Sequence, residues 1–138
     1  MSKPIDVAVA LIQDNDGKVL ITQRSDQVAH AGCWEFPGGK FEPLETPVEA
    51  LRREVLEEVN LEVQQSHFVE KIEHTYPEKS VCLHIFEVRE FRGQAQICDG
   101  QKNLLWVMPS ELKSFTFPEA NQRIIHHLCA SSSSELSH

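Results

Sequence analysis

The chain has 138 residues, enough for one domain with a hydrophobic core but not for two. It carries 21 acidic and 13 basic residues, a formal net charge of −8, and no basic run, which argues against a nucleic-acid polymer as a partner. A small phosphorylated ligand is compatible with this charge if metal ions screen the acidic groups. Apolar runs are too short for a membrane span or a signal peptide. We expect a cytoplasmic monomer with no membrane partner.

The first segments favour β-structure. Residues 5–12 (IDVAVALI) predict a buried strand, 14–17 (DNDG) a turn, and 19–23 (VLITQ) the second arm of a hairpin. Arg24 ends that strand, and its pattern fits a surface arginine as well as a ligand-facing one. Residues 25–33 lack a period and predict a loop.

A Gly-Gly-Lys segment follows the short stretch WEFP. Alternation places Trp34 and Phe36 on one side of a short strand, where they pack in the core or stack on a base. Gly38, Gly39 and Lys40 do not have the spacing of a P-loop, but glycines permit a tight turn whose backbone meets a phosphate or a metal.

A helix is predicted from Pro47 to Val59. Thr46 is a suitable N-cap, Glu49 completes a capping box, and Pro47 suits the first helical position. Asn60 follows the last apolar position and tolerates the left-handed conformation of a C-terminal cap. The stripe expected to pack on the core consists of Val48, Leu51, Val55 and Val59.

Three carboxylates share another arc of this helix. Glu54, Glu57 and Glu58 are spaced i, i+3 and i+4, so they converge on one point. Like charges at these spacings destabilise a bare helix, and a hard divalent cation is the natural compensation. Arg53 is placed to hold one carboxylate through a bidentate pair.

The second half of the chain predicts strands at 68–75 and 80–91, the latter central because it is apolar on both faces, and a turn at 76–78. We interpret His74 and His84 as ordinary strand residues rather than ligands. The four cysteines have no CxxC spacing, which favours reduced thiols over disulfides or a zinc site. These cysteines are Cys33, Cys82, Cys98 and Cys129.

The C-terminal region is expected to finish the domain with short elements. An edge segment at 95–98, a strand at 104–108 and a helical turn at 109–113 precede a final helix that begins around Pro118. Asp99 begins the loop between the edge segment and that strand. Residues 1–130 then form one domain, and the serine-rich tail 131–138 is expected to be disordered.

The helix and its flanks form a longer pattern. Five residues separate Gly39 from Glu45, and seven separate Glu45 from Arg53. This spacing, with the carboxylates that follow it, resembles the Nudix box, and the one departure is Asn60, where the family has Gly. The matching positions are Gly39, Glu45, Arg53, Glu54, Val55, Glu57, Glu58 and Leu61.

The resemblance implies an α/β Nudix fold, in which a mixed β-sheet is sandwiched between helices (α/β/α) and the box forms a loop–helix–loop. Within the family the chain is most similar to the MutT group of 8-oxo-dGTP diphosphatases. This similarity rests on residues 21–24 (ITQR), 34–42 (WEFPGGKFE), the box and 117–121 (FPEAN).

By resemblance, the metal ligands are Glu54, Glu57, Glu58, the backbone carbonyl of Gly38, and Asp99 in place of a family glutamate. Arg53 and Glu45 join the three box glutamates as catalytic residues. The implied substrate-binding residues are Arg24, Phe36, Gly38, Gly39, Lys40 and Asn121. Whether His30 and Trp34 contact the substrate stays open.

The implied reaction is Mg²⁺-dependent hydrolysis of 8-oxo-dGTP to 8-oxo-dGMP and pyrophosphate, which sanitises the nucleotide pool and prevents mutation during DNA replication; Mn²⁺ is an alternative cofactor. One alternative is a Nudix pyrophosphohydrolase of another nucleotide, such as dCTP, ADP-ribose or a broad set of triphosphates. A second is a nucleotide-binding regulatory module without catalysis, which the presence of all three box glutamates disfavours.

Overall fold

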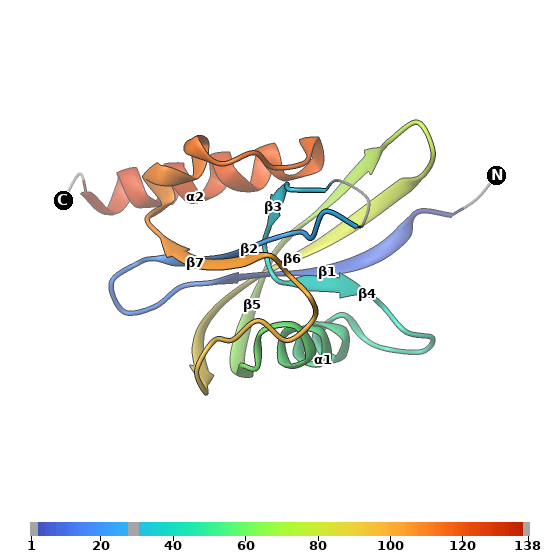
Figure 1. Ribbon diagram of the computed structural model, residues 1–138, viewed down its shortest axis with the longest axis horizontal. Coiled ribbons are helices and arrows are strands. Elements are labelled where there is room, and N and C mark those ends of the chain that lie inside the picture. The colour runs from blue at the N-terminus through green and yellow to red at the C-terminus, as the bar shows by residue number, and fades with distance from the viewer. Residues whose placement is uncertain (1–2, 28–30, 137–138) are drawn as a thin grey trace.

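The computed structural model describes residues 3–27 and 31–136, and the side chains up to residue 130. Its central element is a four-stranded mixed sheet (Figure 1). The two central strands run parallel, and each outer strand is antiparallel to its neighbour. In spatial order the strands are β4 (Gly38–Lys40), β1 (Ile5–Ile12), β6 (Ser80–Arg92) and β5 (Glu62–Thr75).

A second sheet of three antiparallel strands packs beside the first. It consists of β3 (Trp34–Glu35), β2 (Val19–Gln23) and β7 (Asn103–Val107), in that order. The hairpin predicted between the first two strands is therefore wrong, because β1 and β2 belong to different sheets and share only a bridge between Gln13 and Val19. The turn between them exists, with Gly17 at φ 83°, but β1 is paired on both edges by β4 and β6.

Two helices cover opposite sides of the strands (Figure 1), which confirms the expected α/β/α layering. Helix α1 (Pro47–Val59) packs on one core together with Ala8, Ala10 and Phe86. Helix α2 (Gln122–Leu136) packs on the other core. Two 3₁₀ turns lead into α2, η1 (Pro109–Ser114) and η2 (Glu119–Asn121).

The limits of α1 agree with the sequence. Thr46 accepts a hydrogen bond from the Glu49 N–H, the Glu49 carboxylate accepts one from the Thr46 N–H, and Asn60 is left-handed at φ 63°. The expected apolar stripe is wrong at one position, since Val48 is 42% exposed. Ala50 is buried instead, so the buried face of α1 is rotated about the helix axis relative to the expected one.

Three other boundaries differ from expectation. Strand β5 starts at Glu62, well before residue 68. Residues 95–98 form no strand; the N–H groups of Gln96 and Cys98 instead bind the carbonyls of Val59 and Glu58 at the end of α1. The final α-helix begins only at Gln122 and continues to Leu136. The division into a domain at 1–130 and a tail stays a prediction, and residues 137–138 lie outside the described residues.

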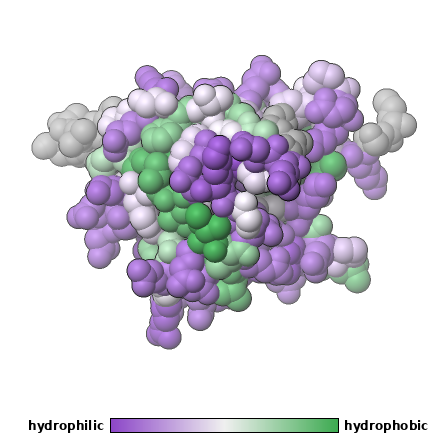
Figure 2. Space-filling view, in the orientation of Figure 1, coloured by the Kyte–Doolittle hydropathy of each residue, from purple (hydrophilic) through white to green (hydrophobic). Residues whose placement is uncertain are grey.

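Within residues 3–27 and 31–136, no helix combines the length and apolar character needed to cross a membrane. The face shown in Figure 2 is largely hydrophilic, with one hydrophobic strip across it. All four cysteines are free, as expected.

The capping box gives a first prediction. Thr46→Ala removes the acceptor for the Glu49 N–H, so the free energy of unfolding should fall by about 1 kcal/mol. Thr46→Ser keeps the hydroxyl and should stay near the parent. Equilibrium urea unfolding measures both, and equal stability of all three proteins would contradict the assigned cap.

Candidate active site

Arg53 organises the carboxylates around the start of α1. Its Nε and one terminal nitrogen donate to the two Glu45 oxygens at 2.7 and 2.8 Å, a bidentate pair. The same guanidinium donates to Glu54 Oε1 at 2.7 Å, to Glu57 Oε2 at 3.3 Å and to the Lys40 carbonyl at 3.0 Å. One side chain thus joins the preceding loop, strand β4 and the helix.

These contacts shift the ionisation of the pair. The Arg53 hydrogen bonds, with one from the Glu42 N–H, lower the pKa of Glu45 to about 2. The Glu45 carboxylate in turn raises the pKa of Arg53 further above its usual range. Both groups therefore stay charged at any working pH, and the link between loop and helix is permanent.

Glu58 lies in a different environment from Glu45. Its Oε1 accepts a hydrogen bond from the Gly38 N–H at 3.0 Å. Burial raises the pKa of Glu58 to about 8, and the carboxylates of Glu35, Glu54 and Asp99 add to the effect. A cation in this place would offset both causes, so Glu58 is the carboxylate that most needs one.

The glycines of β4 allow the helix carboxylates to come close. A Cβ on Gly39 would collide with the Glu54 carboxylate, and one on Gly38 would collide with the Ala8 carbonyl of the neighbouring strand. Burial between helix and strand also raises the pKa of Glu54, against the opposing effect of Arg53. The backbone of β4 therefore lies directly against the Glu54 carboxylate of α1, with no side chain of β4 between them.

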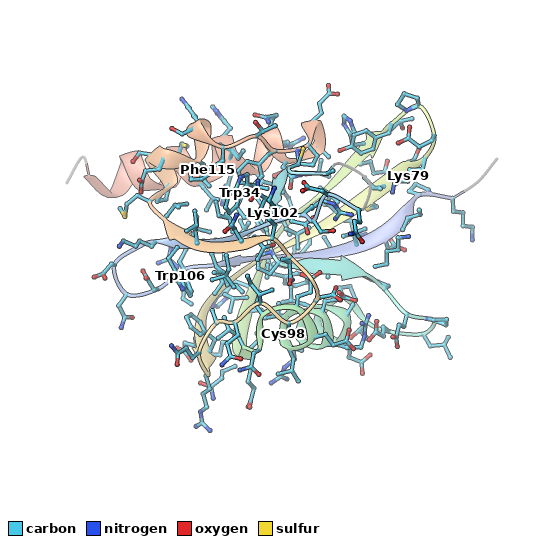
Figure 3. All side chains as sticks on the ribbon, in the orientation of Figure 1. Trp34, Lys79, Cys98, Lys102, Trp106 and Phe115 are labelled. Carbon is cyan, nitrogen blue, oxygen red and sulfur yellow. The ribbon has the colours of Figure 1, made fainter. Side chains whose placement is uncertain are left out.

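Asp99 is brought to the same place by the loop after β6. The Cys98 N–H and the Gln101 side chain both donate to the Glu58 carbonyl, at 3.1 and 3.2 Å, and Figure 3 shows Cys98 over α1. Asp99, Glu58 and Glu35 line one cavity of about 110 Å³. The structure thus brings Asp99 beside Glu58, and its role as a metal ligand stays a prediction.

A larger cavity of about 440 Å³ adjoins the carboxylates. Its walls combine the α2 side of the four-stranded sheet with the turn before α2. All six predicted substrate-binding residues line it, together with Glu58; these are Arg24, Phe36, Gly38, Gly39, Lys40 and Asn121.

The aromatic residues of β3 and its flank divide between core and cavity. Phe36 is buried, stacks on Phe117 at 5.1 Å between ring centroids and still lines the cavity. Trp34 contacts Phe115 edge-on at 5.0 Å, and Figure 3 shows the two side by side near α2. Trp34 therefore packs against the core, its contact with substrate stays open, and His30 lies outside the described residues.

Comparison with known proteins places this site in a family. The NUDIX domain model matches residues 8–127. The 8-oxo-dGTP diphosphatase of Haemophilus influenzae is 35% identical over 91% of this chain and 92% of its own. The CTP pyrophosphohydrolase of Escherichia coli is 36% identical over 86% and 87%.

The chain belongs to the Nudix family. A solved MutT structure, from work on Aliivibrio salmonicida and Vibrio cholerae, superposes with a TM-score of 0.81 at 30% identity, covering 94% of this chain and 99% of that one. The solution structure of E. coli ORF135 gives 0.83 at 32%, covering 96% and 93%. The resemblance inferred from the box is therefore confirmed at the level of the family and fold.

Three cavity residues of this Nudix domain escaped the sequence analysis. Glu35 pairs with Arg24 at 2.9 Å, and its position opposite Trp34 and Phe36 in the alternation could have indicated it. Tyr76 and Lys79 belong to the β5–β6 turn, whose sequence gave no sign that it reaches the cavity.

The donor set fits a divalent metal ion. Glu54, Glu57 and Glu58 offer only oxygen, and Asp99 is near enough to affect the pKa of two of them. Among the described residues, Arg53 is the one cation in contact with the box glutamates, and it binds Glu54 and Glu57 rather than Glu58. Hard oxygen donors with excess negative charge select Mg²⁺-like ions.

The approach of β4 to α1 gives a second prediction. Gly39→Ala should displace the Glu54 carboxylate and weaken Mn²⁺ binding roughly tenfold, measured by calorimetry. In a Glu54→Ala background the new Cβ meets no carboxylate, so adding Gly39→Ala should not weaken Mn²⁺ binding any further. Equal losses in both backgrounds would contradict the proposed clash.

Glu58 gives a third prediction, for the protein kept metal-free with a chelator. Because its folded pKa is raised to about 8, folding retains a proton that the unfolded chain loses above its ordinary pKa. Stability is therefore full below about pH 4.5 and falls as the pH rises towards 8, by on the order of a few kcal/mol.

Denaturant unfolding across this pH range measures the slope. Glu58→Gln should remove most of it. The matched control Glu57→Gln changes an exposed carboxylate and should retain it, and an unchanged slope in Glu58→Gln would refute the assignment.

Proposed function

We propose that this Nudix domain hydrolyses 8-oxo-dGTP to 8-oxo-dGMP and pyrophosphate with Mg²⁺ as cofactor. The observation that carries the proposal is a single cavity that joins the carboxylate Glu58 to two candidate base-reading side chains, Arg24 and Asn121. Its volume of about 440 Å³ lies in the range of small-molecule sites. Similarity to the H. influenzae 8-oxo-dGTP diphosphatase supports the choice of substrate.

The box residues would hold the metal and the attacking water. Bound Mg²⁺ would neutralise charge on the phosphate oxygens and lower the pKa of a coordinated water. Glu54 uses Oε1 to bind Arg53, which leaves its Oε2, lying against Gly39, to orient or deprotonate water. Glu45 acts through Arg53, which it fixes by two hydrogen bonds.

The reaction would proceed by attack of water on the β-phosphorus. The bond from the β-phosphorus to the oxygen that bridges it to the α-phosphorus breaks, and this oxygen leaves with the nucleoside monophosphate. Pyrophosphate carries away the oxygen of water. Lys40 lines the cavity and is exposed, and it would supply positive charge for the phosphates.

The base would be read at the far end of the cavity. The Asn121 carboxamide offers a donor and an acceptor to the edge of a purine. Arg24 is held by Glu35 at 2.9 Å, so its guanidinium is oriented before substrate enters. Phe36, fixed by stacking on Phe117, supplies an apolar surface beside the base.

A second candidate substrate is a pyrimidine nucleoside triphosphate such as CTP or dCTP. The observation in its favour is the 36% identity to the E. coli CTP pyrophosphohydrolase over most of both chains. The carboxylates do not distinguish the two, because they act on the phosphates and not on the base. Arg24 and Asn121 would therefore determine which base is preferred.

Steady-state hydrolysis with Mg²⁺ provides the fourth prediction. We expect kcat/KM for 8-oxo-dGTP to exceed that for dGTP, dCTP and CTP by about a hundredfold, or roughly 2.7 kcal/mol. Asn121→Ala should reduce this preference roughly tenfold, since it removes the hydrogen bonds that distinguish the oxidised base. Pyrophosphate release measures all four substrates.

Gln122→Ala is the matched control, because it changes the next residue, which is exposed, and should leave the preference intact. Faster hydrolysis of CTP or dCTP would overturn the substrate and leave the chemistry standing. No hydrolysis of any triphosphate would overturn the proposal as a whole.

A further inference from the structure

A second group of potential ligands, Asp6, Cys82 and His84, lies on the central strands. Strands β1 and β6 run parallel, with Asp6 opposite Cys82 and Ala8 opposite His84. One ligand atom from each of the three residues lies within 4.8 Å of the other two. The residues are distant in sequence and are brought together by the register of the sheet.

This group lies on the other side of the sheet from the nucleotide cavity. Val7, Val81 and Leu83 line the nucleotide cavity on the α2 side of the sheet. Because side chains alternate along a strand, Asp6, Cys82 and His84 point to the opposite side, the one that faces α1. The inference below therefore does not depend on the proposed nucleotide chemistry.

The cluster has buried walls and one open side. Cys82 and His84 are each 6% exposed. The Phe41 ring covers His84 at 4.8 Å between ring centroids. The Asp6 side chain is 53% exposed, so an ion and a water molecule can reach the group from solvent.

His84 has an unsatisfied nitrogen. Its Nε2 lies 2.9 Å from Asp6 Oδ1, but no donor or acceptor of the described side chains reaches its buried Nδ1. Because Nε2 is the nitrogen beside Asp6, an ion bound between these two residues would coordinate Nε2.

We propose that Asp6, Cys82 and His84 bind a Zn²⁺-class transition metal ion. Thiolate, imidazole and carboxylate together are the ligand set that zinc prefers, and the hard oxygen donors of the Nudix box suit Mg²⁺ instead. Water completes a fourth position on the open side at Asp6. Coordination by Cys82 requires the thiolate, so the ion replaces the thiol proton, which passes to solvent.

The existing separations are near those of a tetrahedral site. Zinc bond lengths of about 2.0–2.3 Å put neighbouring ligand atoms roughly 3.3–3.6 Å apart. The measured range extends from 2.9 Å between His84 and Asp6 to at most 4.8 Å. Shifts of about 1 Å, within reach of the Asp6 and Cys82 rotamers, close the difference.

The absence of a CxxC spacing argued against zinc, but that argument concerns only ligands that are close in sequence. Cys82 and His84 are two residues apart on one face of β6, and the third ligand comes from β1, 76 residues away from Cys82. The competing interpretation is a histidine held by one hydrogen bond to Asp6 and by Phe41. Spectroscopy separates the two.

Co²⁺ titration of the metal-free full-length protein is the fifth prediction. Co²⁺ is a spectroscopic substitute for Zn²⁺, and thiolate coordination gives an intense near-ultraviolet charge-transfer band that carboxylates cannot give. We expect this band to saturate at one equivalent and to disappear when Zn²⁺ is added. Cys82→Ser should abolish it, and Asp6→Asn should keep it with roughly tenfold weaker binding.

Cys98→Ser is the essential control, because this exposed thiol lies beside Asp99 and could ligate an ion bound in the Nudix site. The band should survive in Cys98→Ser and in Glu57→Gln. Asp6→Asn changes a side chain on the open side, so it keeps the test decisive if Cys82→Ser fails to fold. Absence of the band in the wild-type protein, its loss in Cys98→Ser, or unchanged affinity in Asp6→Asn would each overturn the proposal.

Discussion

The structure depends on keeping several carboxylates close together between α1 and β4. Arg53 makes this tolerable on one side, where it neutralises Glu45 and contacts Glu54 and Glu57. Among the described residues the hydrogen-bond donor to the Glu58 carboxylate is the Gly38 N–H, and burial raises the pKa of Glu58 to about 8. The fold therefore stores an unfavourable charge at the point where a cation would offset it. Selection for metal binding explains such an arrangement better than selection for stability.

Glycine makes that concentration of charge geometrically feasible. Side chains at 38 and 39 would collide with the Ala8 carbonyl and the Glu54 carboxylate. Pairing of β4 with β1 then fixes the distance from the helix to the nucleotide cavity, because β1 lines that cavity. A change at either glycine would thus act on the box carboxylates and on the wall of that cavity together. The two glycines and Arg53 therefore act together, although Gly39 and Arg53 are 14 positions apart in the sequence.

Local chemistry determined what the sequence could predict. The limits of α1 follow from Thr46, Glu49 and Asn60, which act on neighbouring backbone groups, and all three behave as expected. The convergence of Glu54, Glu57 and Glu58 follows from helix geometry alone. Pairing of β1 with β6 instead of β2 depends on contacts between residues 76 positions apart, which no local pattern encodes. The same limit hid Glu35, Tyr76 and Lys79 from the site and left the proximity of His84 to Asp6 unpredicted.

The parallel pairing of β1 and β6 has a chemical consequence for both faces of the sheet. Alternation along these strands gives one face Val7, Val81 and Leu83, which form the apolar wall of the nucleotide cavity. It gives the other face Asp6, Cys82 and His84, a group of carboxylate, thiol and imidazole side chains. Phe41 lies over that set and directly follows Lys40, whose carbonyl binds Arg53. The proposed ion site and the Arg53 network are thus linked through the consecutive residues Lys40 and Phe41.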